Sequence, residues 1–152
     1  MAPIQITLAQ PADHEWCARL MACSEPWITL QRDLDGCRRV LSRPGTELFV
    51  ARDESGGDPI GFVLLAPYGL AGSPYIASIA VAPAAQDHGV GSQLITFTEQ
   101  HYRDRAHLFL LVSSFNPRAQ QFYRRHGFQF VGELKDYIVP HHSELIFHKR
   151  LA

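Results

Sequence analysis

The stretch Gln86-Asp87-His88-Gly89-Val90-Gly91-Ser92 stands directly between an apolar run and an amphipathic segment. The run before it, residues 76–81, is short and rich in β-branched side chains, and Pro83 follows it, which predicts the end of a strand. From Val90 onward, within and beyond this stretch, apolar side chains recur at helical spacing, at Val90, Leu94 and Phe97. The sequence therefore predicts a glycine-containing turn that leads from a strand into the N-terminus of a helix.

This turn is predicted to bind an anion. The first turn of a helix has N–H groups without partners inside the helix, and it carries partial positive charge. Gly89 and Gly91 have no Cβ, so a bulky anion such as a pyrophosphate can approach the backbone closely. The dinucleotide-binding pattern Gly-x-Gly-x-x-Gly does not fit, because position 94 is Leu instead of the third glycine. The Walker A phosphate-binding loop does not fit either, because no lysine separates Gly91 from Ser92. A nucleotide-binding module is therefore disfavoured.

A second pattern follows at residues 116–128, which read Asn-Pro-Arg-Ala-Gln-Gln-Phe-Tyr-Arg-Arg-His-Gly-Phe. Asn116 is a good N-cap, and Pro117 suits the first position of a helix. Gly127 is typical of the residue that ends a helix. Tyr123 falls on the face that the apolar side chains of this segment share. The pattern predicts a short, well-capped helix.

Together, Gln-x-x-Gly-x-Gly and Asn-x-x-Ala-x-x-x-Tyr-x-x-x-Gly-Phe resemble the two signatures of the GNAT superfamily of N-acyltransferases, in the family's order and spacing. The resemblance covers roughly the C-terminal two thirds of the chain. It implies an acetyl-CoA-dependent N-acetyltransferase in which an amine attacks the thioester directly, without a covalent enzyme intermediate. Acetyl-CoA would be the cosubstrate, and the acceptor would be a small-molecule or peptide amine.

Length and composition fit one mixed α/β domain over residues 1–152, with 46% hydrophobic and 19% charged residues. The net charge of −1 argues against a nucleic-acid partner bound through a broad basic surface. The three cysteines form no Cys-x-x-Cys pair, and neither a signal-like segment nor an apolar run of membrane length occurs. We therefore expect a reducing, cytoplasmic location, no membrane partner and no metal.

The pattern along the chain predicts the element order β-α-α-β-β-β-α-β-α-β-β. Strands are expected at 4–8, 47–52, 60–66, 75–81, 107–113, 128–139 and 143–151, helices at 11–23, 30–41, 90–101 and 117–126, and a loop at 67–74. The GNAT fold has this order around a central mixed, largely antiparallel sheet. In that family the strands corresponding to 75–81 and 107–113 splay apart. Strand 143–151 is expected at an exposed edge, and the resemblance implies a homodimer through that end.

The resemblance also assigns the coenzyme contacts. The pantetheine arm would lie in the gap between the splayed strands and bond to strand backbone. The expected contacts are Ile79, Val81, Gln86, Asp87, His88, Gly89, Val90, Gly91, Ser92, Asn116 and Tyr123. Asp87 departs from the glycine or basic residue common there. Its charge is unfavourable beside a pyrophosphate unless the side chain points outward or only its N–H is used.

Acyl transfer to an amine needs a base for the amine and a proton for the leaving thiolate. An amine such as that of lysine has an unperturbed pKa of about 10.4, so its proton must be removed at neutral pH. Tyr123 matches the family's general acid, and a phenol is suited to protonate sulfur. The alternative for Tyr123 is a core aromatic residue whose hydroxyl only forms a hydrogen bond.

The base stays unassigned, because strand 75–81 has no acidic residue and Ser78 is suited only to orient a water. Candidates near the acceptor in relatives are Glu25, His141 and His142, and histidine has a suitable intrinsic pKa. Trp27 would line the acceptor pocket or pack over the sheet edge. The acceptor amine and the choice between acetyl and longer acyl donors stay open. A non-catalytic acyl-CoA-binding regulatory domain is the alternative function.

Overall fold

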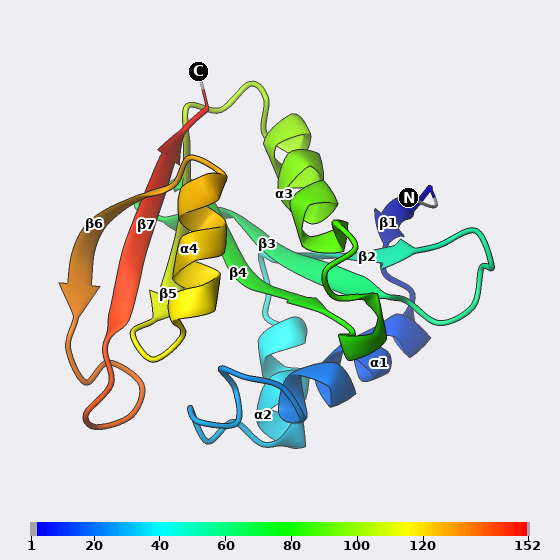
Figure 1. Ribbon diagram of the computed structural model, residues 1–152, viewed down its shortest axis with the longest axis horizontal. Helices are drawn as coiled ribbons and strands as arrows, with labels where there is room; N and C mark the ends of the chain where they lie inside the picture. The colour runs from blue at the N-terminus through cyan, green and yellow to red at the C-terminus, as the bar shows by residue number, and fades with distance from the viewer. Residues whose placement is uncertain (1–2, 152) are drawn as a thin grey trace.

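The computed structural model describes residues 3–151 as a seven-stranded sheet covered by helices (Figure 1). The strands are β1 (Gln5–Leu8), β2 (Glu47–Arg52), β3 (Gly61–Leu70), β4 (Ser73–Val81), β5 (His107–Ser113), β6 (Gln129–Leu134) and β7 (Glu144–Arg150). The helices are α1 (Pro11–Ala22), α2 (Leu34–Leu41), α3 (Val90–His101) and α4 (Pro117–Arg125), with a 3-10 turn, η1 (Pro83–Ala85). The predicted order of strands and helices is confirmed.

The strand order in the sheet is β1-β2-β3-β4-β5-β7-β6, and every neighbouring pair is antiparallel except β4 and β5. That parallel pair is brief, because only Tyr75 and Ile76 align with Phe109 and Leu110. Beyond Ile76 the two strands diverge, as Figure 1 shows where β4 and β5 run apart behind α4. The predicted splay in a mixed, largely antiparallel sheet is therefore confirmed.

Alternating side chains of β3 pack against helices on both faces of the sheet. Phe62 and Leu64 belong to the core beneath α1 and α2, whereas Val63 and Leu65 belong to the core beneath α3 and α4. Successive residues of a strand point to opposite faces, so a continuous apolar run serves two layers at once. These two cores fix the central strands from which the candidate site is built.

The prediction of a loop over residues 67–74 is wrong. β3 continues to Leu70 and β4 begins at Ser73, with Ala71 and Gly72 forming the turn at φ 52° and 79°. Pro67 is tolerated because the pairing between β3 and β4 is irregular between Ala66 and Leu70. Glycine and proline here mark a bulge within a long hairpin and not its end.

The second helix begins later than its apolar pattern suggests. It starts at Leu34, where the Asp33 side chain accepts a hydrogen bond from Gly36 N at 2.7 Å, so an N-cap sets the boundary. The expected strand 128–139 is also shorter, since β6 ends at Leu134. In both places local hydrogen bonding and turns override the hydrophobic spacing.

The expected exposed edge is on a different strand. β7 lies between β5 and β6, so both of its sides are paired, and β6 forms the edge of the sheet. The expectation failed because the last strand in sequence returns to the interior of the sheet. Within residues 3–151 no helix is long and apolar enough to cross a membrane.

Candidate active site

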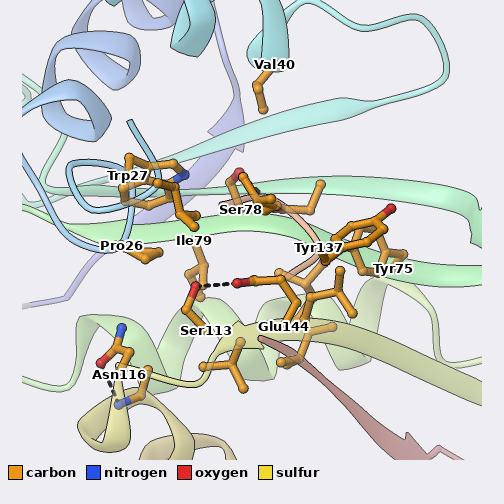
Figure 2. Close-up of a pocket in the computed structure, with 18 of the residues that line it drawn as sticks. Pro26, Trp27, Val40, Tyr75, Ser78, Ile79, Ser113, Asn116, Tyr137 and Glu144 are labelled. Carbon is orange, nitrogen blue, oxygen red and sulfur yellow. Dashed lines mark hydrogen bonds between the residues drawn. The ribbon is translucent and has the colours of Figure 1, made fainter. Parts of the chain in front are cut away.

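A cavity of about 750 Å³ lies where β4 and β5 diverge. Its walls come from the 25–32 loop, β3, β4, β5, α4 and the segment that leads into β7. Figure 2 shows polar and aromatic side chains from these elements facing one another across the gap. Elements far apart in sequence therefore meet at one hollow, and the 86–92 turn follows the end of β4 that borders it.

The 86–92 turn presents backbone N–H groups. Asp87 and Gly89 both have positive φ, 65° and 81°, and Gly89 is the residue that precedes α3. The bond from Gln93 N to Gly89 O, 3.1 Å long, is the first helical bond of α3. The N–H groups before Gln93 consequently have no acceptor within the helix. This geometry suits the pyrophosphate that the sequence predicts.

Side chains of the turn hold it in place. Gln86 Nε2 donates to Val81 O at 3.2 Å, which ties the turn back to the end of β4. The Asp87 carboxylate accepts from Arg118 at 2.6 Å, and both side chains are about three-quarters exposed (77% and 74%). Asp87 thus points outward to a cation, which is the arrangement that makes its charge acceptable beside an anion.

Three more residues of the turn have distinct surroundings. His88 is exposed, whereas Val90 is buried in the core, so only the backbone of Val90 is available to a ligand. Ser92 Oγ lies 3.0 Å from His126 Nε2. Burial lowers the pKa of His126, so its ring is neutral at neutral pH. These contacts fasten α3 to the end of α4.

Gly91 is required by packing between helices. A Cβ at this position would lie 3.2 Å from Phe122 Cζ on α4, which is tighter than ordinary contact. The missing side chain therefore lets the first turn of α3 approach α4. From sequence, Gly91 is predicted only to let an anion approach the backbone, and its role in helix packing is visible only in the structure.

Asn116 and Tyr123 come to the cavity from α4. Asn116 Oδ1 accepts from Ala119 N at 3.2 Å, which confirms the N-cap, and both Asn116 and Tyr123 line the cavity. Tyr123 is 8% exposed, and burial raises the pKa of its phenol. The phenol therefore stays protonated at neutral pH and has a proton to give.

Glu144 is a cavity residue that sequence reasoning missed. It is the first residue of β7, it lies opposite Ser113 of β5, and Ser113 Oγ donates to its carboxylate at 2.8 Å. Figure 2 shows the carboxylate beside Ser113, with Ser78 on the strand across the gap. The only sequence signal was an acidic residue inside an apolar closing strand.

The residues expected near the acceptor separate into two groups. Glu25, Trp27 and Ser78 line the cavity. Glu25 accepts hydrogen bonds from Thr29 N at 3.0 Å and Thr29 Oγ1 at 2.7 Å, so its carboxylate is held within its own loop. Ser78 donates to Ala77 O at 2.8 Å. Trp27 is also part of the core with α1 and α2, so it packs and lines the cavity at once.

His141 and His142 are not among the residues that line the cavity. The backbone N–H of His141 donates to the Asp136 side chain at 2.6 Å, and the ring of His142 packs 4.7 Å from that of Phe115. Between residues 3 and 151 there is also no cluster of three side chains suited to hold a metal ion. The candidate site combines the backbone N–H groups of the 86–92 turn with a cavity that holds the Tyr123 phenol and the buried Glu144 carboxylate.

Comparisons with known proteins agree with this architecture. The model of the acetyltransferase (GNAT) family matches residues 9–128. A protein of the GNAT family from Desulfovibrio desulfuricans has a similar structure, with a TM-score of 0.81 and 20% identity over 99% of this chain and 100% of the other. A search of curated proteins finds no match.

Two further solved structures are similar. Nourseothricin acetyltransferase is 30% identical over 72% of this chain and 67% of its own, with a TM-score of 0.63. A spermidine N-acetyltransferase from Vibrio cholerae, in complex with CoA and spermine, is 18% identical over 97% of this chain and 95% of its own, with a TM-score of 0.73.

Proposed function

This chain belongs to the acetyltransferase (GNAT) family, and from that membership we propose that it transfers an acetyl group from acetyl-CoA to a primary amine. The observation that carries the proposal is the cavity between β4 and β5, which Tyr123 lines and which includes the part of β4 that leads toward the 86–92 turn. A coenzyme with a pyrophosphate and an extended arm matches this combination of a backbone anion site and an open strand edge.

The coenzyme is proposed to lie along the open side of β4. Beyond Ile76 this strand pairs with β3 alone among the strands of residues 3–151, so its other side is free to bond to the pantetheine amides. Ile79 and Val81 would supply backbone groups, and the N–H groups of residues 86–92 would hold the pyrophosphate. Asn116 would contact the amides while it caps α4. The similar spermidine N-acetyltransferase is in complex with CoA, which supports a CoA thioester as the ligand.

The reaction is proposed to proceed by direct attack. The amine nitrogen bonds to the thioester carbonyl carbon, the carbon–sulfur bond breaks, and Tyr123 gives its phenolic proton to the departing thiolate. The phenol recovers a proton from the acylated nitrogen. Cys17 and Cys37 are buried away from the cavity lining, so neither is placed to form an acyl-enzyme.

The acceptor is proposed to be a small-molecule or peptide amine. The cavity wall includes the aromatic side chains Trp27, Tyr75 and Tyr137, which suit the aliphatic portion of such an acceptor. The similar V. cholerae structure holds spermine, a polyamine, which makes polyamines a sensible first class to assay.

The test combines calorimetric titration of acetyl-CoA with thiol release against a panel of polyamines, aminoglycosides, amino acids and peptide N-termini. We expect binding, together with release that depends on one amine class. Binding without release from any amine would favour the alternative, a non-catalytic acyl-CoA-binding domain. An absence of acetyl-CoA binding would contradict the proposal, and competition by adenine dinucleotides would point to a nucleotide site. Titration of propionyl-CoA and succinyl-CoA in parallel would identify the acyl donor.

A further inference from the structure

The cavity contains a carboxylate that the proposed reaction has not yet used. Glu144 is 5% exposed, and it lines the same cavity as Tyr123. Glu144 reaches the cavity from β7, so it lies outside the two sequence motifs, which cover residues 86–92 and 116–128. Resting on the proposed acetyl transfer, we propose that Glu144 is the general base that takes a proton from the acceptor ammonium.

Glu144 has no ion-pair partner among the described residues, and the charge of His142 acts on it only from beyond ion-pair distance. The Glu144 carboxylate accepts a hydrogen bond from Ser113 Oγ. A carboxylate has room for further donors, and a buried charge without a partner is costly. An acceptor ammonium that enters the cavity would supply both the missing cation and the missing donor.

Burial also adjusts the carboxyl group for this task. Burial raises the pKa of Glu144, while the Ser113 hydrogen bond and the charge of His142 oppose that rise. A base whose pKa is closer to neutrality removes a proton from an ammonium more effectively than an ordinary glutamate.

The other ionisable groups near Glu144 include three phenols, one histidine, one further carboxyl group and two arginines. The groups that surround it or share its cavity are Tyr75 on β4, Tyr123 on α4, Tyr137 and His142 before β7, and Glu25, Arg32 and Arg43 elsewhere on the wall. Burial and the Glu144 charge raise the pKa of Tyr75 to about 12. Tyr75 and Tyr123 are therefore uncharged in the working range, so Glu144 is the buried carboxylate that is available as a base beside them.

The proton balance of the step is complete. The ammonium gives one proton to the Glu144 carboxylate, and the neutral amine then attacks the thioester carbon. The nitrogen loses a second proton as the amide forms, and one proton ends on the thiolate by way of Tyr123. Glu144 releases its proton to solvent after turnover, so the net products are the amide, free CoA thiol and one proton.

The test is a pH profile of kcat in Glu144→Gln, measured with an alkyl amine that the wild type acetylates. We expect kcat to fall roughly 100-fold, with acetyl-CoA affinity unchanged. The wild-type rate should decline toward acid pH as Glu144 becomes protonated, and this decline should be absent from the variant. An acceptor analogue whose amine is already neutral at the assay pH should restore most of the loss, because it needs no base.

Two further variants sharpen the result. Ser113→Ala removes the donor that favours the charged carboxylate, so the acid decline should move to higher pH. Glu133→Gln changes an exposed glutamate of β6 that accepts from Ser143 outside the cavity lining, and it should match the wild type. If Glu144→Gln does not fold, Ser113→Ala decides, and an unmoved decline would overturn the assignment.

The possible outcomes separate this inference from the function on which it rests. If Glu144→Gln keeps both the wild-type kcat and the acid decline, Glu144 is not the base although acetyl transfer stands. If the wild type transfers acetyl to no amine, the proposed function fails, and the assignment of Glu144 falls with it.

Discussion

The two parts of the candidate site are built in different ways. The proposed coenzyme end is formed by consecutive residues of the 86–92 turn, which offers mainly backbone N–H groups. The proposed acceptor end is formed by side chains from separate elements that line the cavity, among them Trp27, Tyr75, Tyr137 and Glu144. A backbone site depends on local conformation and is recognisable in sequence, whereas a side-chain site depends on which distant strands become neighbours.

This contrast predicts that substitutions at one end leave the other end intact. The coenzyme end should be sensitive to glycine substitutions and insensitive to most changes of side chain. The acceptor end should show the opposite behaviour, with losses in kcat or KM while acetyl-CoA affinity holds. Each substitution below would support or break that separation.

Tyr123→Phe is expected to have the largest effect. It keeps the ring that packs against Phe128 and Phe147 but removes the proton donor. We expect kcat to fall about 100-fold or more, with little change in acetyl-CoA affinity by calorimetry. The matched control is Tyr102→Phe, because the Tyr102 hydroxyl is buried without a hydrogen-bond partner in residues 3–151. That control should leave kcat unchanged. Equal turnover by Tyr123→Phe and wild type would remove Tyr123 from the acid role.

Gly91→Leu should break the coenzyme end. Its side chain would press on Phe122 and separate the first turn of α3 from α4. We expect acetyl-CoA to bind about 10- to 100-fold more weakly, in line with the usual 1–3 kcal/mol cost of overpacking. Calorimetric titration measures the change. Thr96→Leu adds the same side chain at an exposed position of α3 and should retain full affinity. An unaltered dissociation constant for Gly91→Leu would contradict the proposed turn.

Gly69→Ala should disturb the acceptor end alone. A Cβ there would lie 2.6 Å from Ala66 Cβ and 2.9 Å from Tyr75 Cβ, so the bulge of β3 or the Tyr75 side chain must shift. We expect a loss of about 1–3 kcal/mol in unfolding free energy and a several-fold higher acceptor KM. Gly57→Ala, whose Cβ would meet only Ser55 Oγ at 3.7 Å, is the control. A weaker acetyl-CoA affinity in Gly69→Ala would show that the two ends are coupled.

Asp87→Asn should have the smallest effect. The Asp87–Arg118 pair is exposed, and such pairs contribute at most about 1 kcal/mol. Asparagine also tolerates the positive φ of this position. We expect the dissociation constant of acetyl-CoA to change less than about threefold, measured at low and at high salt. A large loss of affinity would mean that the Asp87 carboxylate itself takes part in the site.

The glycine turn, the capped helix at Pro117–Arg125 and the order of strands and helices could be predicted from sequence. Each depends on residues within a few positions of one another, since caps, positive-φ glycines and hydrophobic spacing are local properties. The resemblance to the GNAT family also anticipated the splay of β4 from β5. These features determined the fold and the proposed coenzyme end of the candidate site.

Only the tertiary structure decided the acceptor end. Ser113 and Glu144 are neighbours because β7 enters the sheet beside β5, and this pairing leaves β6 at the edge where the closing strand was expected. The same placement brings Glu144 into the cavity of Tyr123. Strand order follows from how distant apolar faces are buried together, which no local pattern encodes. Burial then sets the pKa of that carboxyl, so its proposed chemistry depends on the completed fold.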